Sequence, residues 1–223
     1  MSIGNNLNQI KASLPNNVTL VAVSKTKPNQ AIIEAYEAGQ HIFGENKIQE
    51  MTEKFEVLPK DIQWHMIGHV QRNKVKYIAP YVSLIHGVDS FKLLQEINKQ
   101  AKKHNRIIPC LLQIFIAKEE TKFGLDKTEL FEILNSEEFK ALENISIKGL
   151  MGMATFTDNE SIIRQEFISL KEIYDEVNQK FGHLENLDIT TLSMGMSNDY
   201  KIAIECGSTM IRIGSSIFGS RNY

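Results

Sequence analysis

A lysine, an arginine and several small polar residues follow short apolar runs that lie far apart in this 223-residue chain. Lys25 ends the run V-T-L-V-A-V-S-K at 18–25, whose β-branched residues are typical of a strand buried on both faces. The lysine side chain should therefore lie at the rim of the core. An amine held there can lose its proton and form a Schiff base with an aldehyde or ketone. Lys25 is the first candidate for chemistry, although most lysines of any chain are solvated surface charges.

Two turns rich in glycine and serine follow apolar runs near the C-terminus. L-S-M-G-M-S-N-D at 192–199 contains Ser197, and R-I-G-S-S-I-F-G at 212–219 contains Gly214 and Ser215. Glycine turns and helix N-termini bind phosphate through backbone N–H groups. Each motif alone is equally typical of an ordinary capped turn, so only the pair of them favours a phosphate site.

Arg212 lies within the last apolar run, where it alternates with Ile211 and Ile213 and should point to the opposite face. A buried guanidinium needs a partner. One candidate is a carboxylate such as Glu205 in a structural pair, and the other is an acceptor on a bound ligand. Spacing alone does not separate the two.

Two histidines, His65 and His69, form an H-x-x-x-H pattern. The residues between them are typical of a strand end and a turn, and no glutamate follows His65 as it does in the zinc motif H-E-x-x-H. We predict packing and hydrogen-bonding roles rather than a metal site. Methionines near strand ends, Met194 among them, usually fill the core.

Eight apolar runs alternate with longer amphipathic stretches of helical spacing. The predicted strands cover 18–24, 41–46, 63–68, 84–88, 109–116, 145–153, 190–194 and 209–213. This alternation predicts parallel strands with right-handed crossovers, and eight units are the number in a (β/α)₈ barrel. We expect one domain over 1–223, with an extra N-terminal helix at about 3–14. The alternative is an open doubly wound sheet, but no predicted strand is followed by G-x-G-x-x-G.

The barrel prediction has a consequence for the site, because active groups of such barrels lie after the strands at one face. The polar residues at those positions are Lys25, Asn46, His65, His69, Ser197, Asn198, Gly214, Ser215 and Ser216. In barrels, a phosphate site is frequently built from the loops after strands seven and eight. The fold would thus bring the lysine and both turns together.

Composition restricts the partners. A formal net charge of −2 gives no general attraction to nucleic acid or to anionic membranes. Cys110 and Cys206 lie far apart without a C-x-x-C spacing, which is typical of a reducing cytosol. No apolar run approaches the ~18 residues of a membrane span, and the first residues do not resemble a secretory signal. We expect a cytoplasmic protein.

A lysine at one end of a site and a phosphate cup at the other predict a ligand with an aldehyde and a phosphate, and pyridoxal 5′-phosphate (PLP) fits. Five blocks also resemble the signature blocks of the pyridoxal phosphate homeostasis proteins, in the same order and over nearly the whole chain. They are V-A-V-S-K-T, H-I-F-G-E-N-K-I-Q-E, W-H-M-I-G-H-V-Q-R-N-K, L-S-M-G-M-S-N-D and R-I-G-S-S-I-F-G. The resemblance implies a barrel similar to the N-terminal domain of alanine racemase, PLP fold type III.

The same resemblance implies a role for each matching residue. Lys25 would carry PLP as a Schiff base, and Arg212 would face the pyridine nitrogen. The remaining cofactor-binding residues are Asn46 and Met194 beside the cofactor and Ser197, Gly214 and Ser215 at the phosphate. Two positions depart from the family pattern: Ser215 stands where many members have threonine, and Lys47 stands where the residue is often aromatic.

An arginine at the ring nitrogen disfavours its protonation and weakens the ring as an electron sink. That suits a carrier or a racemase better than a transaminase. In enzymes similar to alanine racemase the second acid–base residue comes from another domain. We therefore expect a monomeric PLP-binding protein of vitamin B6 and amino-acid homeostasis, without robust catalysis and with PLP-dependent apoenzymes as candidate recipients. The alternatives are a PLP-dependent amino-acid racemase, or a Schiff-base lyase or aldolase that uses Lys25 on a phosphorylated sugar without a cofactor.

Overall fold

The computed structural model describes residues 2–117 and 123–219. Within them, eight parallel strands form a closed barrel in which each strand pairs with the next and the last pairs with the first. The strands are β1 (Thr19–Val23), β2 (Ile42–Glu45), β3 (Gln63–Met66), β4 (Leu84–Val88), β5 (Ile108–Gln113), β6 (Ile145–Met151), β7 (Leu187–Met196) and β8 (Met210–Ile213). The predicted (β/α)₈ barrel is confirmed. The doubly wound alternative is wrong, because β1 pairs with both β2 and β8.

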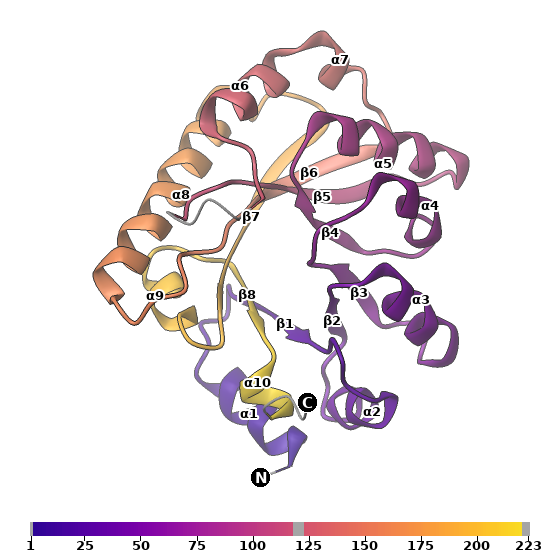
Figure 1. Cartoon of the computed structure of the whole chain (residues 1–223), viewed down its shortest axis with the longest axis vertical. Coiled ribbons are helices and arrows are strands. Elements are labelled where there is room, and N and C mark those ends of the chain that lie inside the picture. The colour runs from indigo at the N-terminus through magenta and orange to yellow at the C-terminus, as the bar shows by residue number, and fades with distance from the viewer. Residues whose placement is uncertain (1, 118–122, 220–223) are drawn as a thin grey trace.

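Helices surround this barrel (Figure 1). They are α1 (Ile3–Ala12), α2 (Asn29–Glu37), α3 (Ile48–Val57), η1 (Arg72–Lys74), α4 (Val75–Ile78), α5 (Phe91–Lys103), α6 (Lys127–Asn135), α7 (Glu137–Lys140), α8 (Glu160–Phe181), α9 (Tyr200–Glu205) and α10 (Ser215–Phe218). The α1 helix precedes β1 and packs against α10, where the Asn6 side chain donates to the Ile217 carbonyl at 3.0 Å. This contact links the two ends of the chain. None of the described helices is long and apolar enough to cross a membrane.

Several element boundaries differ from the sequence prediction. The fifth strand was expected to reach Ile116, but β5 ends at Gln113, because the chain then turns and Ile114 forms an isolated bridge with Leu125. The seventh strand is longer than predicted, at Leu187–Met196. The helix α7 is not predicted, since four residues are too few to display a helical period.

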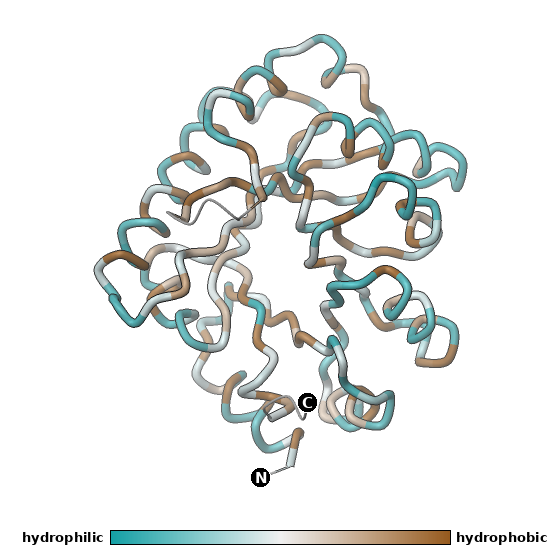
Figure 2. The backbone as a smooth tube through the Cα atoms, in the orientation of Figure 1, coloured by the Kyte–Doolittle hydropathy of each residue, from teal (hydrophilic) through white to brown (hydrophobic). Residues whose placement is uncertain are grey.

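Apolar side chains fill two spaces. Between the strands and the helices lies the larger core, with Phe43, Trp64, Phe139 and Phe167 among its fully buried members. Inside the barrel lies a smaller cluster formed by Val21, Leu84, Leu111, Met151 and Met210. In Figure 2 the strands are mostly hydrophobic and the outer helical turns are mostly hydrophilic. Burial of each large apolar side chain contributes about 1.5–3 kcal/mol, so both clusters stabilise the closed barrel.

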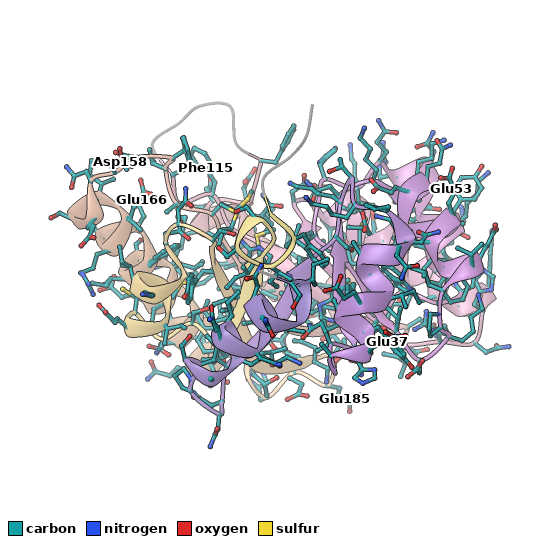
Figure 3. The ribbon with its side chains drawn as sticks, turned by 90° about the horizontal axis from the view of Figure 1, so that it is seen from below. Glu37, Glu53, Phe115, Asp158, Glu166 and Glu185 are labelled. Carbon is teal, nitrogen blue, oxygen red and sulfur yellow. The ribbon has the colours of Figure 1, made fainter. Side chains whose placement is uncertain are left out.

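The two ends of the barrel are distinct. Figure 3 shows Phe115 and Asp158, which follow β5 and β6, on one side of the molecule. Glu37 and Glu185, which precede β2 and β7, lie on the opposite side. The first side is the end where the strands finish, and it carries the predicted polar residues.

Candidate functional site

A cavity of about 220 Å³ opens at this end of the barrel. Its lining includes six of the seven predicted cofactor-binding residues, which come from both halves of the chain: Lys25, Asn46, Ser197, Arg212, Gly214 and Ser215. The topology explains this convergence, because closing a parallel barrel brings the ends of β1, β2, β7 and β8 side by side.

Lys25 follows β1 in a turn and is half-buried. Ser24 before it is fully buried, and its N–H donates to the Gly44 carbonyl of β2 at 3.0 Å. Thr26 after it has φ +64°, the left-handed region that β-branched residues avoid. The amine therefore projects from a turn with an unusual backbone, at the rim of the core as predicted.

The turns after β7 and β8 meet at the same cavity. The Gly214 N–H donates to the Ser197 hydroxyl at 3.3 Å, which joins the two turns directly. At Gly195 the backbone has φ +96°, and an added Cβ would lie 2.6 Å from the Cβ of Ala203. Ser215 begins α10, whose N-terminus has no side-chain cap. Because α10 has only four residues, hydroxyl and backbone N–H groups, rather than a helix dipole, would bind an anion here.

Arg212 is 4% exposed and lines the same cavity. Its Nη1 donates to the Ser193 hydroxyl at 2.6 Å, and its Nη2 donates to the Gly152 carbonyl at 3.2 Å. Burial lowers the pKa of Arg212 to about 10, with the Asp199 carboxylate acting in the opposite sense, so the guanidinium is charged at neutral pH. The structural pair with Glu205 is wrong, because Glu205 pairs with Arg164 on the surface.

A chain of buried polar groups continues from Arg212 across the barrel interior. The Ser193 hydroxyl lies 3.1 Å from Nδ1 of His86, and Nε2 of His86 lies 3.1 Å from Nδ1 of His65. Burial lowers the pKa of His65 to about 3 and lowers that of His86 well below its ordinary value, to which His65 and Arg212 also contribute. Both imidazoles are neutral at physiological pH. Sequence reasoning found no partner for His86, because its neighbours come from strands distant in sequence.

The two histidines of the H-x-x-x-H pattern do not act together. His65 points into the barrel, whereas His69 pairs with Asp89 at 3.0 Å and stacks on Phe123. Over residues 2–117 and 123–219, no group of three histidine, cysteine or acidic side chains is placed to hold a metal ion.

Met194 is the predicted residue that the structure places elsewhere. It is fully buried in the outer core and does not line the cavity. The strand register shifts between Ser193 and Met196, and Met196 lines the cavity instead.

Lys27 is a residue of the cavity that sequence reasoning missed. It lines the cavity too, and its Nζ donates to the carbonyls of Phe218 and Gly219 at 3.1 Å each.

A second cavity, of about 560 Å³, adjoins the first at Asn46. It lies between the start of α3 and the segment after β3, with Lys47, His69, Lys74 and Tyr77 in its lining. Lys47, the departure from the family pattern, is exposed at the N-cap of α3 and therefore changes this neighbouring cavity rather than the one with Lys25.

The 220 Å³ cavity thus has the groups that a phosphorylated aldehyde requires. Its lining combines the amine of Lys25, the hydroxyls of Ser197 and Ser215 and the buried guanidinium of Arg212. The set fits PLP, whose aldehyde, phosphate and ring nitrogen need these three kinds of group.

Comparisons with known proteins agree with this geometry. The family model described as "Alanine racemase, N-terminal domain" matches residues 1–222. The pyridoxal phosphate homeostasis protein of Haemophilus influenzae is 38% identical, with 100% of this chain and 98% of that protein covered. The protein of the same name from Aquifex aeolicus is 40% identical, covering 92% and 87%.

Solved structures similar to this chain include a PLP-bound protein and an alanine racemase. PipY of Synechococcus elongatus PCC7942, solved with PLP bound, has a TM-score of 0.88 at 34% identity and covers 98% of this chain and 100% of its own. An alanine racemase of Clostridium difficile 630 has a TM-score of 0.82 at 16% identity, and the match covers 100% of this chain and 57% of the racemase. The second likeness concerns the fold alone.

Proposed function

The chain belongs to the pyridoxal phosphate homeostasis protein family, and from this premise we propose that it binds PLP as a Schiff base on Lys25. We further propose that it acts in intracellular PLP and amino-acid homeostasis without robust catalysis. The observation that carries the proposal is the meeting of Lys25, the Ser197–Gly214 pair and Arg212 in one 220 Å³ cavity. PLP supplies an aldehyde for the covalent link and a ring that can withdraw electrons from a bound amine.

The residues of the chain take three roles. Lys25 would hold the ligand at the rim through its amine, which can condense with an aldehyde with loss of water. The Ser197 and Ser215 hydroxyls and the Gly214 backbone bind the phosphate. Arg212 would face the ring nitrogen and, because its guanidinium remains charged, would oppose protonation of that nitrogen.

The lining of the cavity favours a carrier over a racemase. Among its described residues there is no carboxyl, phenol or imidazole group that could act as a second acid–base residue opposite Lys25. We propose PLP-dependent apoenzymes as recipients and a monomer as the working state, testable by transfer to a purified apoenzyme and by light scattering.

Absorption spectroscopy of the wild type, Lys25→Ala and Lys148→Ala tests the proposal. Lys148 is a matched control, since it pairs with Asp188 on the surface. We expect the wild type and Lys148→Ala to be yellow and Lys25→Ala to lack the visible band. Borohydride should fix PLP on the wild-type peptide that contains Lys25. A wild type that stays colourless after PLP is added would refute the proposal.

Two further assays separate the alternatives. Chiral analysis after long incubation with a panel of amino acids should show no appreciable turnover, and racemisation would overturn the carrier assignment. Borohydride trapping of phosphorylated sugars should fail in protein free of PLP, and trapping there would favour an aldolase.

A further inference from the structure

The turn that carries Lys25 is held by an ion cluster formed by Glu45 at the end of β2 and by Glu50 and Lys54 in α3. Nζ of Lys54 donates to Glu45 Oε1 at 2.7 Å, to Glu50 Oε1 at 2.7 Å and to the Ser24 carbonyl at 2.8 Å. The Ser24 hydroxyl donates to the same Glu45 oxygen at 2.6 Å. All three protons of the Lys54 ammonium are thereby used.

This cluster is buried, which an ordinary pair on a helix surface is not. The side chains of Lys54 and Glu45 are 6% and 0% exposed, and that of Glu50 is 24% exposed. Desolvation raises the pKa of Glu45, and Lys54 and Ser24 oppose the rise. Burying such charges is costly unless each is paired and hydrogen-bonded. The arrangement therefore needs a reason beyond helix stability.

The reason lies in its contacts on either side of Lys25. Lys54 binds the carbonyl of Ser24, and Oε1 of Glu50 accepts the N–H of Thr26 at 2.6 Å. Thr26 has the left-handed φ of +64° that a β-branched residue adopts only when its surroundings impose it. The hydrogen bond that the Thr26 N–H donates to Glu50 holds this peptide group.

We propose that Glu50 and Lys54 are positioning residues that fix the backbone on both sides of Lys25 before its ligand arrives. The turn is then preorganised, and binding does not have to order it. This inference rests on the proposed function only where it concerns PLP affinity. The conformation of the turn itself can be measured in the protein without PLP.

The test compares Glu50→Ala with Glu50→Gln, Glu50→Asp and the control Glu53→Ala. Glutamine keeps a carbonyl that can accept the Thr26 N–H, whereas aspartate is one methylene shorter and cannot reach both Thr26 and Lys54. Glu53 lies on the exposed face of the same helix, where its carboxylate accepts from the Gln49 side chain at 3.1 Å. It therefore controls for the change in helix propensity.

Two readouts are measured for each variant. In protein free of PLP, amide exchange of Thr26 by NMR should become at least tenfold faster in Glu50→Ala, intermediate in Glu50→Asp and unchanged in Glu50→Gln and Glu53→Ala. In titrations with PLP, Glu50→Ala should bind about tenfold more weakly, the effect of one lost hydrogen bond to a charged group. The position of the visible band should not change, since no group at the ligand is altered.

The outcomes separate this inference from the proposed function. A wild type that never binds PLP overturns the function and leaves the Thr26 exchange as the test of the cluster. Unchanged Thr26 exchange in Glu50→Ala overturns the positioning role even if PLP binds. If the amides of Thr26 and of the core strand β4 accelerate equally, the cluster is a general stabiliser and the inference is wrong. Glu50→Asp provides the same comparison where Glu50→Ala does not fold.

Discussion

Lowering the pH from 7 to 5 should destabilise this protein through His65 and His86. Burial lowers the pKa of His65 to about 3 and lowers that of His86 well below 6.5, whereas both titrate near pH 6.5 in the unfolded chain. Below pH 6.5 the unfolded state therefore binds more protons than the folded state. Stability falls as the pH falls, over the window from about 6.5 down to about 3 for His65.

The size of the effect follows from linkage. For each histidine that is neutral in the folded state, the free energy of unfolding falls by about 1.4 kcal/mol per pH unit well below the pKa of the unfolded chain. Between pH 7 and pH 5 the fall is about 2 kcal/mol per histidine. The two together give an upper value of about 4 kcal/mol, a large part of the 5–15 kcal/mol typical of a domain. Glu45, whose pKa is raised, contributes with the opposite sign, and this contribution is shared by wild type and variants.

The assay is urea unfolding at pH 7, 6 and 5 for the wild type, the double variant His65→Gln/His86→Gln and the control His183→Gln. His183 is exposed. We expect the free energy of unfolding of the wild type and the control to fall by up to about 4 kcal/mol more than that of the double variant. Comparing slopes with pH removes any difference in stability at pH 7. Equal slopes in all three proteins would refute the claim that the two imidazoles are held neutral by burial.

Three smaller predictions follow from the geometry. Gly195→Ala should cost about 2 kcal/mol or more in thermal or urea unfolding, because the residue has φ +96° and its methyl would lie 2.6 Å from a neighbouring Cβ; a loss below about 0.5 kcal/mol would contradict this. Arg164→Ala should leave the midpoint of urea unfolding nearly unchanged, since its pair with Glu205 is exposed, and a clear shift of the midpoint would contradict this. Burial raises the pKa of the Cys110 thiol, so Ellman's reagent should label Cys206 in the folded protein and Cys110 only after unfolding; early labelling of both would contradict it.

Much of the barrel and of the site could be predicted from the sequence. Strands buried on both faces appear as continuous apolar runs, and each helix between them has its own period, so the element order follows from local patterns. Closing the barrel then makes the strand ends neighbours. That is why Lys25 and Gly214, almost two hundred residues apart, could be assigned to one site before any contact was known.

Contacts that depend on which face of a helix or strand turns inward could not be predicted from the order of the elements. Glu50 and Lys54 have the i, i+4 spacing of an ordinary surface pair, and nothing local shows that this face of α3 turns inward onto Ser24. The sequence likewise left open whether Arg212 pairs with a carboxylate such as Glu205 or with a ligand, and the structure excludes Glu205 because it pairs with Arg164. Arg212 points into the barrel and Glu205 lies on the outside of α9, so nearness in sequence did not mean nearness in space.

The strand interiors connect the apolar filling of the barrel with its polar site. The smaller core cluster contains Leu84, Leu111 and Met210, which lie on three different strands. Two residues further along each strand, and so on the same face, come a histidine, a glutamine and an arginine: His86, Gln113 and Arg212. All three strands thus change from apolar to polar after the same step toward the end where the cavity lies. The apolar layer closes the barrel below, and the polar layer above it includes Arg212, which lines the cavity, and His86, which is linked to Arg212 through Ser193. Arg212 stays charged there because burial lowers its pKa only to about 10, against the opposing effect of the Asp199 carboxylate, and because the Ser193 hydroxyl and the Gly152 carbonyl accept its hydrogen bonds.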